Sequence, residues 1–227
     1  MSVSELSASA QNYVKAIWSL TEWSADPVTP TLIAERTGLK LSSVSDAVRR
    51  LSAQGLVTYA PYGAIELTEM GRTYALAMVR RHRLIESFLV RALGYTWDQV
   101  HDEAENLEHA VSDFMVERID AFLGFPSRDP HGDPIPRADG TIQIPKAQRL
   151  SDVPHDERTV VVERISDADP ALLQFFYQHS IVVGAQLTIS VGDAYSDTIN
   201  ARVSGAEKAI ALGRAATDAL YVSHNHH

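Results

Sequence analysis

Apolar residues in the first part of the chain recur at helical intervals. Tyr13, Ile17 and Leu20 are spaced i, i+4 and i+7, and Val14 widens the same stripe. This spacing is typical of an amphipathic helix that buries one face. We therefore predict a helix across residues 4–23, ended by the proline-containing segment that follows it.

Two shorter helices are expected next. The first covers residues 31–36 and ends at Gly38, which is placed as a C-cap, and the second covers residues 42–55. Ser42 or Ser43 is the expected N-cap of the second helix. Two short helices around a glycine-containing turn are typical of a helix-turn-helix.

After the two short helices, apolar and polar residues begin to alternate, as is typical of β-strands. Residues 56–68 indicate two short strands around a turn at Pro61, Tyr62 and Gly63. A helix-turn-helix followed directly by a hairpin is the winged form of that motif. A long helix is then expected at residues 69–93, and another at 98–122.

The pattern changes again after this helical region. Residues 125–140, FPSRDPHGDPIPRADG, lack periodicity and predict a loop or linker. Beyond it, one short helix at 169–180 interrupts a series of strands, which indicates a small β-barrel at about 155–223. The fold class is therefore mainly α with a small β part. The expected strands are at 159–165, 185–192, 199–205 and 208–213.

Composition narrows the classes of function. The 227 residues include no cysteine, which excludes disulfides, thiolate zinc sites and a cysteine nucleophile. No uncharged apolar run reaches about 18 residues, so we expect a cytoplasmic protein with no membrane partner. The net charge of −9 is uneven: residues 1–83 carry +2 and residues 84–227 carry −11. The mildly basic first third can contact DNA phosphates.

The stretch HDEAENLEH, residues 101–109, holds two histidines and four carboxylates without a lysine or arginine. On a helix, Glu105, Glu108 and His109 are spaced i, i+3 and i+4 and share one face. His101 lies one turn before Glu105. Like charges at this spacing repel. Either the face is only solvated, or a cation belongs there.

The preceding helix supplies a second histidine–carboxylate pair. His82 and Glu86 are spaced i and i+4, and antiparallel packing of the two helices would bring them to His101. Carboxylates and imidazoles without thiolate suit Mn²⁺, Fe²⁺ or Zn²⁺. The alternative is that these residues bind no metal, because a single histidine–carboxylate pair at this spacing is usually a solvated surface pair.

The second short helix offers a polar face for DNA. Small hydroxyls allow a helix to lie deep in the major groove, an aspartate can accept from cytosine, and arginines reach phosphate or guanine. The alternative is an ordinary amphipathic helix whose polar face only meets water. The candidate DNA-contacting residues are Ser42, Ser43, Ser45, Asp46, Arg49 and Arg50.

The order of these features resembles the diphtheria-toxin-repressor family of metal-dependent transcriptional regulators. The resemblance rests on a winged helix-turn-helix followed by RRHRLIESFL, VHDEAENLEHAVSD and DPHGDPIP. It implies a DNA-binding domain at 1–74, a helical dimerisation and metal-binding domain at 75–145, and a linker with an SH3-like barrel at 146–227.

The resemblance also implies two metal sites. His82, Glu86 and His101 match the family's ancillary site, to which the barrel also contributes. Asp169 stands where one barrel ligand is expected, but Leu172 replaces the expected glutamine.

Glu105, Glu108 and His109 match the primary site, and Asn12 takes the position of its remaining side-chain ligand. Iron-responsive members have cysteine where Glu105 stands and methionine where Asn12 stands. The oxygen donors here favour Mn²⁺, with Fe²⁺ the alternative, and other divalent transition metals can substitute. Asn12 could also be a plain surface asparagine.

The expected function is a Mn²⁺-activated repressor of metal-uptake genes. Without metal, the carboxylates of residues 101–109 are expected to repel and leave the first helix free to move. The partners are a double-stranded DNA operator and a second copy of the chain, with no small organic substrate. An iron-dependent regulator and a metallohydrolase are the alternatives, although the HExxH spacing is missing. The expected core and dimer surface includes Leu84, Phe88, Leu107, Val111, Phe114 and Met115.

Overall fold

The structure, a computed structural model, describes residues 3–59, 63–154, 156–192 and 196–224. The contacts divide the chain into two units. No helix in these ranges is long and apolar enough to cross a membrane. Unit 1 comprises Met1–Ile85, Glu105–Phe125 and Ile135–Ile142, and unit 2 comprises Glu86–Ala104, Pro126–Pro134 and Gln143–His227. The predicted division into three domains stays a prediction.

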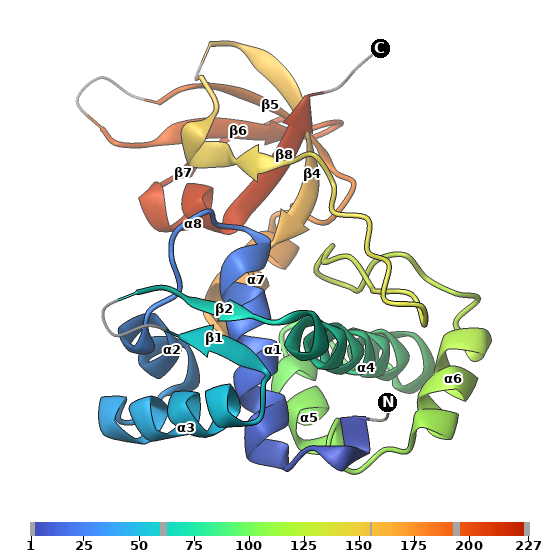
Figure 1. The fold of residues 1–227 in the computed structure, drawn as a ribbon. Helices are drawn as coiled ribbons and strands as arrows, with labels where there is room; N and C mark the ends of the chain where they lie inside the picture. Colours follow the sequence, from blue (N-terminus) through green and yellow to red (C-terminus); the bar gives the residue numbers. More distant parts are fainter. Residues whose placement is uncertain (1–2, 60–62, 155, 193–195, 225–227) are drawn as a thin grey trace. The chain divides into compact units, whose positions relative to one another are not determined.

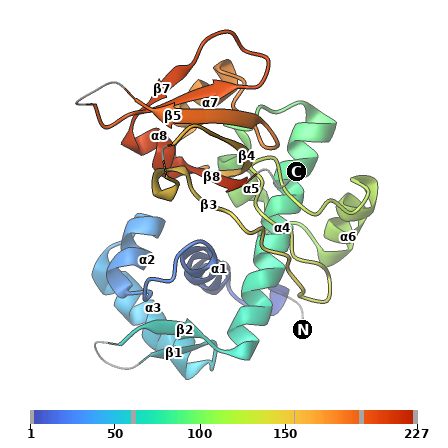
Figure 2. The same ribbon diagram turned by 90° about the horizontal axis from the view of Figure 1, so that it is seen from above.

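The first helix of unit 1, α1 (Ala8–Glu22), carries the predicted apolar stripe. The short 3₁₀ turn η1 (Val3–Glu5) precedes it, and the Ser7 side chain accepts a hydrogen bond from the Ala10 amide to cap it. Its stripe is buried against the winged domain and the first half of α4 (Glu69–Leu93). Figures 1 and 2 show α1 lying between these two groups of elements.

The predicted helix-turn-helix is present as α2 (Pro30–Thr37) and α3 (Leu41–Ala53). Gly38 ends α2 in the left-handed region, at φ 68°. The predicted cap of α3 was wrong. Lys40 is the N-cap and makes no capping hydrogen bond through its side chain. Ser42 and Ser43 lie exposed within the first turn, because the helix begins as soon as the chain leaves the turn after α2.

The wing is a short antiparallel pair, β1 (Val57–Tyr59) and β2 (Ile65–Leu67). Pro61 and Tyr62 of the predicted turn lie outside the described residues. The Thr68 hydroxyl then accepts from the Gly71 amide and starts α4. A Cβ at Gly71 would lie 1.9 Å from the Leu56 carbonyl oxygen, so only glycine allows the wing to meet α4 this closely.

The single helix predicted at 98–122 was wrong, because the structure contains two helices there. α5 (Val100–Leu107) ends before Glu108, and α6 (Asp113–Phe122) begins after Ser112. The Ser112 side chain accepts a hydrogen bond from the Met115 amide, so a new helix start competes with continuation of the old one. Glu108 and His109 therefore lie in a turn.

Unit 2 is built on a six-stranded antiparallel sheet in the order β3-β8-β4-β5-β6-β7, whose strands are labelled between Figures 1 and 2. Alternate residues such as Val160 and Val162 are fully buried, which explains the alternating sequence pattern. β3 and β8 were not predicted, and β8 pairs with β4 near the centre of the sheet. The strands are β3 (Gln148–Arg149), β4 (Arg158–Ile165), β5 (Gln186–Val191), β6 (Ile199–Val203), β7 (Ile210–Leu212) and β8 (Leu220–His224).

Three short helical segments accompany the sheet. They are η2 (Leu150–Asp152), α7 (Pro170–Gln178) and α8 (Arg214–Ala219). Leu173 and Phe176 of α7 are buried with the apolar strand residues in the core of this unit. The helix predicted at 169–180 is thus present, and α8 was not predicted.

The predicted linker contains a buried and well-anchored loop. Within unit 2, the His131 carbonyl accepts from the Ile165 amide, and Arg164 donates to Asp133 at 2.6 Å. Gly132 has a φ of +92°, and a Cβ there would lie 2.2 Å from the Glu163 carbonyl oxygen. The glycine lets the loop lie directly against β4, which holds His131 in place.

Candidate metal centres and DNA-binding surface

A lysine of α1 reaches the acidic stretch in unit 1. The Lys15 ammonium nitrogen lies 2.6 Å from Glu105 Oε1, 2.5 Å from Glu108 Oε1 and 3.5 Å from His82 Nδ1. We call these four residues the acidic cluster. A cation that is 90 residues from Glu105 and 93 from Glu108 in the chain is thus paired with both carboxylates. The predicted repulsion of these carboxylates without metal stays a prediction.

Glu108 is the centre of the acidic cluster. It is fully buried, and its second carboxylate oxygen lies 2.6 Å from His82 Nδ1. Burial by itself would raise the pKa of Glu108, but the hydrogen bond and charge of His82 and the charge of Lys15 outweigh it and lower the pKa. Glu108 is therefore a buried carboxylate that stays ionised at neutral pH. Arg81 holds its backbone by donating to the Glu108 carbonyl at 3.0 Å.

The ring of His109 is oriented by Gln11 of α1. Its Nδ1 lies 2.7 Å from Gln11 Oε1. The Gln11 amide nitrogen donates to the Val3 and Leu6 carbonyls, so Oε1 must accept and Nδ1 must carry the proton. The other ring nitrogen, Nε2, lies 3.7 Å from Glu108 Oε1. Asn12 is exposed on α1.

The donors of the acidic cluster fit a divalent ion. One donor atom from each of His82, Glu105 and Glu108 lies within 4.8 Å of the others, and Nε2 of His109 lies 3.7 Å from Glu108 Oε1. Two carboxylates with imidazoles suit Mn²⁺, Fe²⁺ or Zn²⁺. A hydrogen bond from the other ring nitrogen, as His109 makes to Gln11, is the usual support for a histidine ligand.

A second group of donors lies within unit 2. His101 Nδ1 is 3.0 Å from Asp167 Oδ2 and 3.5 Å from Glu86 Oε1, and His131 Nδ1 is 4.0 Å from Glu86 Oε2. We call Glu86, His101, His131 and Asp167 the His131 cluster. Glu86, His131 and Asp167 each offer an atom within 4.8 Å of the other two, so this cluster also fits a divalent ion.

His131 is fixed inside this cluster. Its ring stacks on Trp97 at an interplanar angle of 10°, and Nε2 lies 2.7 Å from the Trp97 carbonyl oxygen and must donate to it. Nδ1 has no hydrogen-bond partner among the described residues, although His131 is only 1% exposed. An ion bound beside Glu86 would satisfy this buried nitrogen.

The histidines of this cluster balance its negative charge. Burial would lower the pKa of His101, but hydrogen bonds and charges from Asp167 and Glu86 outweigh it and raise the pKa to about 10. Burial likewise opposes protonation of His131, and nearby carboxylates, Glu86 foremost, raise its pKa. A divalent ion would replace these protons, because metal ligands must be deprotonated.

His82 contacts Glu108, and the predicted ancillary set of His82, Glu86 and His101 stays a prediction. Asp169 is an exposed N-cap of α7 that accepts from two backbone amides, and Asp167 faces His101 instead. His131 was visible in the DPHGDPIP motif but served there only as a mark of the family. No sequence signal distinguished Asp167.

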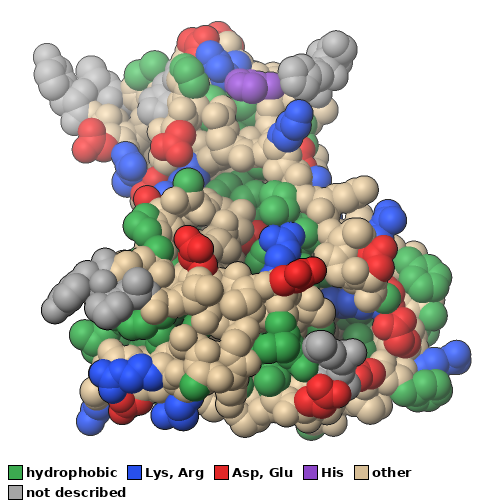
Figure 3. All heavy atoms as spheres, in the orientation of Figure 1, with side chains coloured by type: hydrophobic (Ala, Val, Ile, Leu, Met, Phe, Trp, Pro, Cys, Tyr) green, Lys and Arg blue, Asp and Glu red, His purple; other side chains and the backbone are tan. Residues whose placement is uncertain are grey.

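The polar face of α3 is available to DNA. Val44, Ala47, Val48 and Leu51 are buried, which turns the other side of the helix outward. Figure 3 shows Lys and Arg side chains at the lower left, over α3, with an acidic side chain beside them. All the predicted DNA contacts are exposed except Ser45, which is half-buried and donates to the Leu41 carbonyl. Arg49 pairs with Asp46 at 3.0 Å.

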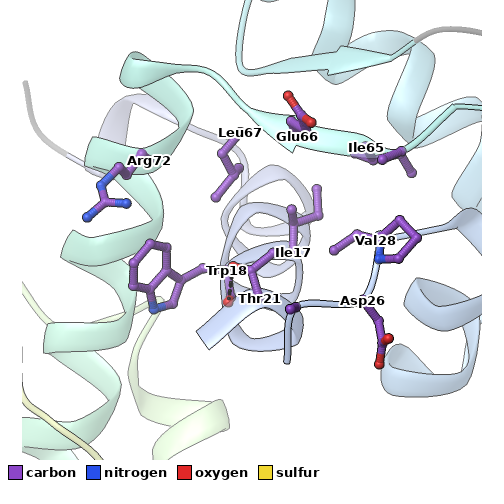
Figure 4. A pocket seen from close by; sticks show the side chains of 12 residues that line it. Ile17, Trp18, Thr21, Asp26, Val28, Ile65, Glu66, Leu67 and Arg72 are labelled. Atoms are coloured by element: carbon purple, nitrogen blue, oxygen red, sulfur yellow. Dashed lines mark hydrogen bonds between the residues drawn. The ribbon is translucent and has the colours of Figure 1, made fainter. Parts of the chain in front are cut away.

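A pocket of about 410 Å³ lies between α1, β2 and α4 in unit 1 (Figure 4). Ile17 and Leu67 project into it, and the Arg72 guanidinium lies 4.7 Å from the centre of the Trp18 ring. Its lining is mainly apolar, and it lies where the wing meets α1 and α4.

Part of the predicted dimer surface is exposed on α6. Phe114 is 75% exposed and Met115 45% exposed, and Phe122, which the prediction did not include, is 67% exposed. Leu84, in contrast, is fully buried and belongs to the interior. Large apolar side chains gathered on one helix are typical of a protein–protein interface.

Three family descriptions match successive parts of the chain. Residues 5–65 match "Iron dependent repressor, N-terminal DNA binding domain", residues 68–137 match "Iron dependent repressor, metal binding and dimerisation domain", and residues 148–224 match "FeoA domain". The iron-dependent repressor IdeR of Mycobacterium leprae is 31% identical over 204 residues, which cover 85% of this chain and 88% of that protein. The chain belongs to the diphtheria toxin repressor family.

Other relatives agree with this assignment. The diphtheria toxin repressor of Corynebacterium efficiens is 31% identical over 82% of this chain and 84% of its own length. A solved structure described as a manganese-dependent transcriptional repressor in complex with manganese is 49% identical. It covers 95% of this chain and 99% of its own, with a TM-score of 0.90.

Family membership confirms the predicted class of protein. The chain is a metal-dependent, DNA-binding transcriptional repressor with a dimerisation domain, and its winged, helical and C-terminal β parts are those of the family. These relatives are repressors and not enzymes, so the metallohydrolase alternative has no support.

Proposed function

We propose that this repressor responds to Mn²⁺ and controls genes for metal uptake. The observation that carries the proposal is the donor set of the acidic cluster, which consists of carboxylate oxygens and imidazole nitrogens in a chain without cysteine. Hard oxygen donors favour Mn²⁺ over ions that prefer sulfur. The relative at 49% identity is described as manganese-dependent, whereas the relative at 31% is named for iron, so Fe²⁺ remains the second candidate.

Glu105, Glu108 and His109 are the proposed ligands of the activating ion. A bound divalent ion supplies positive charge to the two carboxylates. Gln11 holds the ring of His109 from α1, so this helix meets the site through a side chain already in place. The neighbouring Asn12 is the family-based candidate for a ligand from the same helix.

This link explains how metal can affect DNA binding. α1 packs against α2 and α3 in one core, and its Gln11 contacts the proposed ligand His109, so an ion that holds His109 also restrains α1 and, through it, the recognition helix. In a homodimer, the two copies of α3 must reach successive major grooves roughly 34 Å apart. A ligand that favours this arrangement by a few kcal/mol is sufficient to switch it.

The His131 cluster is the proposed second ion site. Glu86 and His101 were expected to belong to an ancillary site, and Asp167 and His131 complete a set within unit 2. We further propose that the protein acts in the cytoplasm, where its operator DNA is found. Ser42, Ser43, Asp46 and Arg50 on α3 are proposed to contact that DNA.

The test is metal-dependent binding to a selected operator. A duplex is first enriched from a random pool with the Mn²⁺-loaded protein, and its binding is then followed by fluorescence anisotropy with Mn²⁺, with Fe²⁺ under anaerobic conditions, or with chelator. We expect tight binding with Mn²⁺ and at least tenfold weaker binding with chelator. Binding that ignores metal would contradict the proposal, and activation by Fe²⁺ alone would favour the iron-dependent alternative.

Matched variants assign the two clusters. Glu108→Gln should abolish activation by Mn²⁺, whereas Glu103→Gln, which lies on α5 outside the cluster, should behave as wild type. Glu86→Gln removes a ligand of the second cluster alone. If Glu86→Gln abolishes activation and Glu108→Gln does not, the activating ion binds at the His131 cluster and not at the acidic cluster.

A further inference from the structure

The acidic cluster already contains a cation that belongs to the chain. The Lys15 ammonium has three protons and three polar neighbours, at 2.6 Å, 2.5 Å and 3.5 Å. Lys15 is 9% exposed and Glu108 fully buried, so solvent screens the pair at Glu108 only weakly. The ammonium thus cancels one of the two carboxylate charges.

The ammonium and a metal ion need the same atoms. Lys15 contacts one oxygen of Glu105 and one of Glu108, and those two carboxylates are the oxygen ligands proposed for the ion. Metal–oxygen bonds are about 2.0–2.6 Å long, so an ion on these oxygens would stand directly beside an ammonium held at hydrogen-bonding distance. Two cations at that separation in a buried site repel strongly.

We propose that Lys15 is a tethered competitor for the metal site, which a divalent ion must displace from Glu105 and Glu108 in order to bind. The inference rests on the proposed function and concerns the same site. Metal binding is then an exchange of one cation for another and not the filling of an empty acidic site. Lys15 sets the free ion concentration at which the repressor responds, because the two ion pairs must be broken first.

A second consequence concerns the connection between α1 and the two carboxylates. Lys15 connects α1 to Glu105 and Glu108 in this structure. When the ammonium leaves, that connection is lost unless the ion is held from α1 as well. Lys15 is therefore a positioning residue whose removal affects metal affinity more directly than it affects DNA contacts.

The test is the affinity for Mn²⁺, measured by titration calorimetry on the metal-free, full-length protein. Lys15→Met removes the charge and keeps an unbranched apolar side chain, Lys15→Arg keeps the charge, and Lys208→Met removes the same charge from an exposed position in unit 2. We expect Lys15→Met to tighten Mn²⁺ binding at one site at least tenfold. Lys15→Arg and Lys208→Met should stay within about threefold of wild type. The affinity of the His131 cluster for Mn²⁺ should be the same in all four proteins.

Equal or weaker binding by folded Lys15→Met would overturn the proposal. A measurement on wild type covers the case in which this variant does not fold. Nitrogen-detected NMR of lysine ammonium groups should show a slowly exchanging signal in the metal-free protein that is absent from Lys15→Arg. Saturation with diamagnetic Cd²⁺ should abolish that signal. Its persistence beside a fully bound ion would show that no displacement occurs.

These outcomes separate the two claims. If wild type takes up Mn²⁺ and binds DNA with it, but Lys15→Met has the wild-type affinity, only the role of Lys15 is refuted. If neither protein takes up Mn²⁺, the proposed function is refuted, and the inference is refuted with it.

Discussion

Replacing Glu108 by glutamine should destabilise the metal-free protein far more than the same change at Glu105. Both carboxylates contact Lys15 at nearly the same distance, 2.5 Å and 2.6 Å, but the Glu108 side chain is fully buried and that of Glu105 is 36% exposed. Breaking a buried pair costs about 3–5 kcal/mol because it leaves an uncompensated charge. Lys15 keeps Glu105 as a partner, so we expect the lower end, about 3 kcal/mol.

The effect of Glu105→Gln should be much smaller. A pair open to solvent contributes about 1 kcal/mol or less. At a urea m-value of about 2 kcal/mol per M, Glu108→Gln lowers the midpoint by about 1.5 M and Glu105→Gln by about 0.5 M or less. Urea unfolding in the presence of chelator, followed by tryptophan fluorescence, measures both, because Trp18 is buried in unit 1.

The dependence on pH adds a second check. The pKa of Glu108 is below its ordinary value of 4.5 in the folded protein, so its stabilising contribution is present above that pH and is lost as the pH falls through the folded pKa. The difference between wild type and Glu108→Gln should therefore shrink in acid. Equal losses from the two glutamines at neutral pH would refute the argument that burial decides the strength of these pairs.

Four further predictions test other parts of the structure. His101 has a pKa raised from 6.5 to about 10, so the metal-free protein should lose stability as the pH rises between those values, and urea midpoints of His101→Gln should lack this loss. Arg50→Ala should lower the slope of log affinity against log salt by about 1 in anisotropy titrations; an unchanged slope would place Arg50 outside the interface. Gly132→Ala should cost about 2 kcal/mol in urea unfolding, because its Cβ would meet the Glu163 carbonyl at 2.2 Å; wild-type stability would contradict the close packing. Phe114→Asp should produce a monomer in sedimentation analysis, since that ring is 75% exposed, and an intact dimer would place the interface elsewhere.

Local patterns were sufficient for most of the elements. The apolar stripe of α1, the glycine that ends α2 and the threonine that starts α4 act through neighbours a few residues away, and the structure has each of them. Where prediction failed, another local bond competed. Ser112 starts a new helix, so residues 98–122 form two helices and Glu108 and His109 lie in a turn.

The sequence by itself determined which chemical groups this protein can offer: carboxylates and imidazoles without sulfur ligands from cysteine, and a polar helix face in a winged domain. Only the tertiary structure decided which groups meet. Lys15 reaches Glu105 across 90 residues, and Asp167 rather than Asp169 faces His101. Gln11 rather than Asn12 faces His109 because successive residues on a helix point about 100° apart, and burial of the apolar stripe sets the rotation of α1. Periodicity in the chain describes neighbours along one element, whereas these contacts depend on how separate elements pack, and that information is long-range.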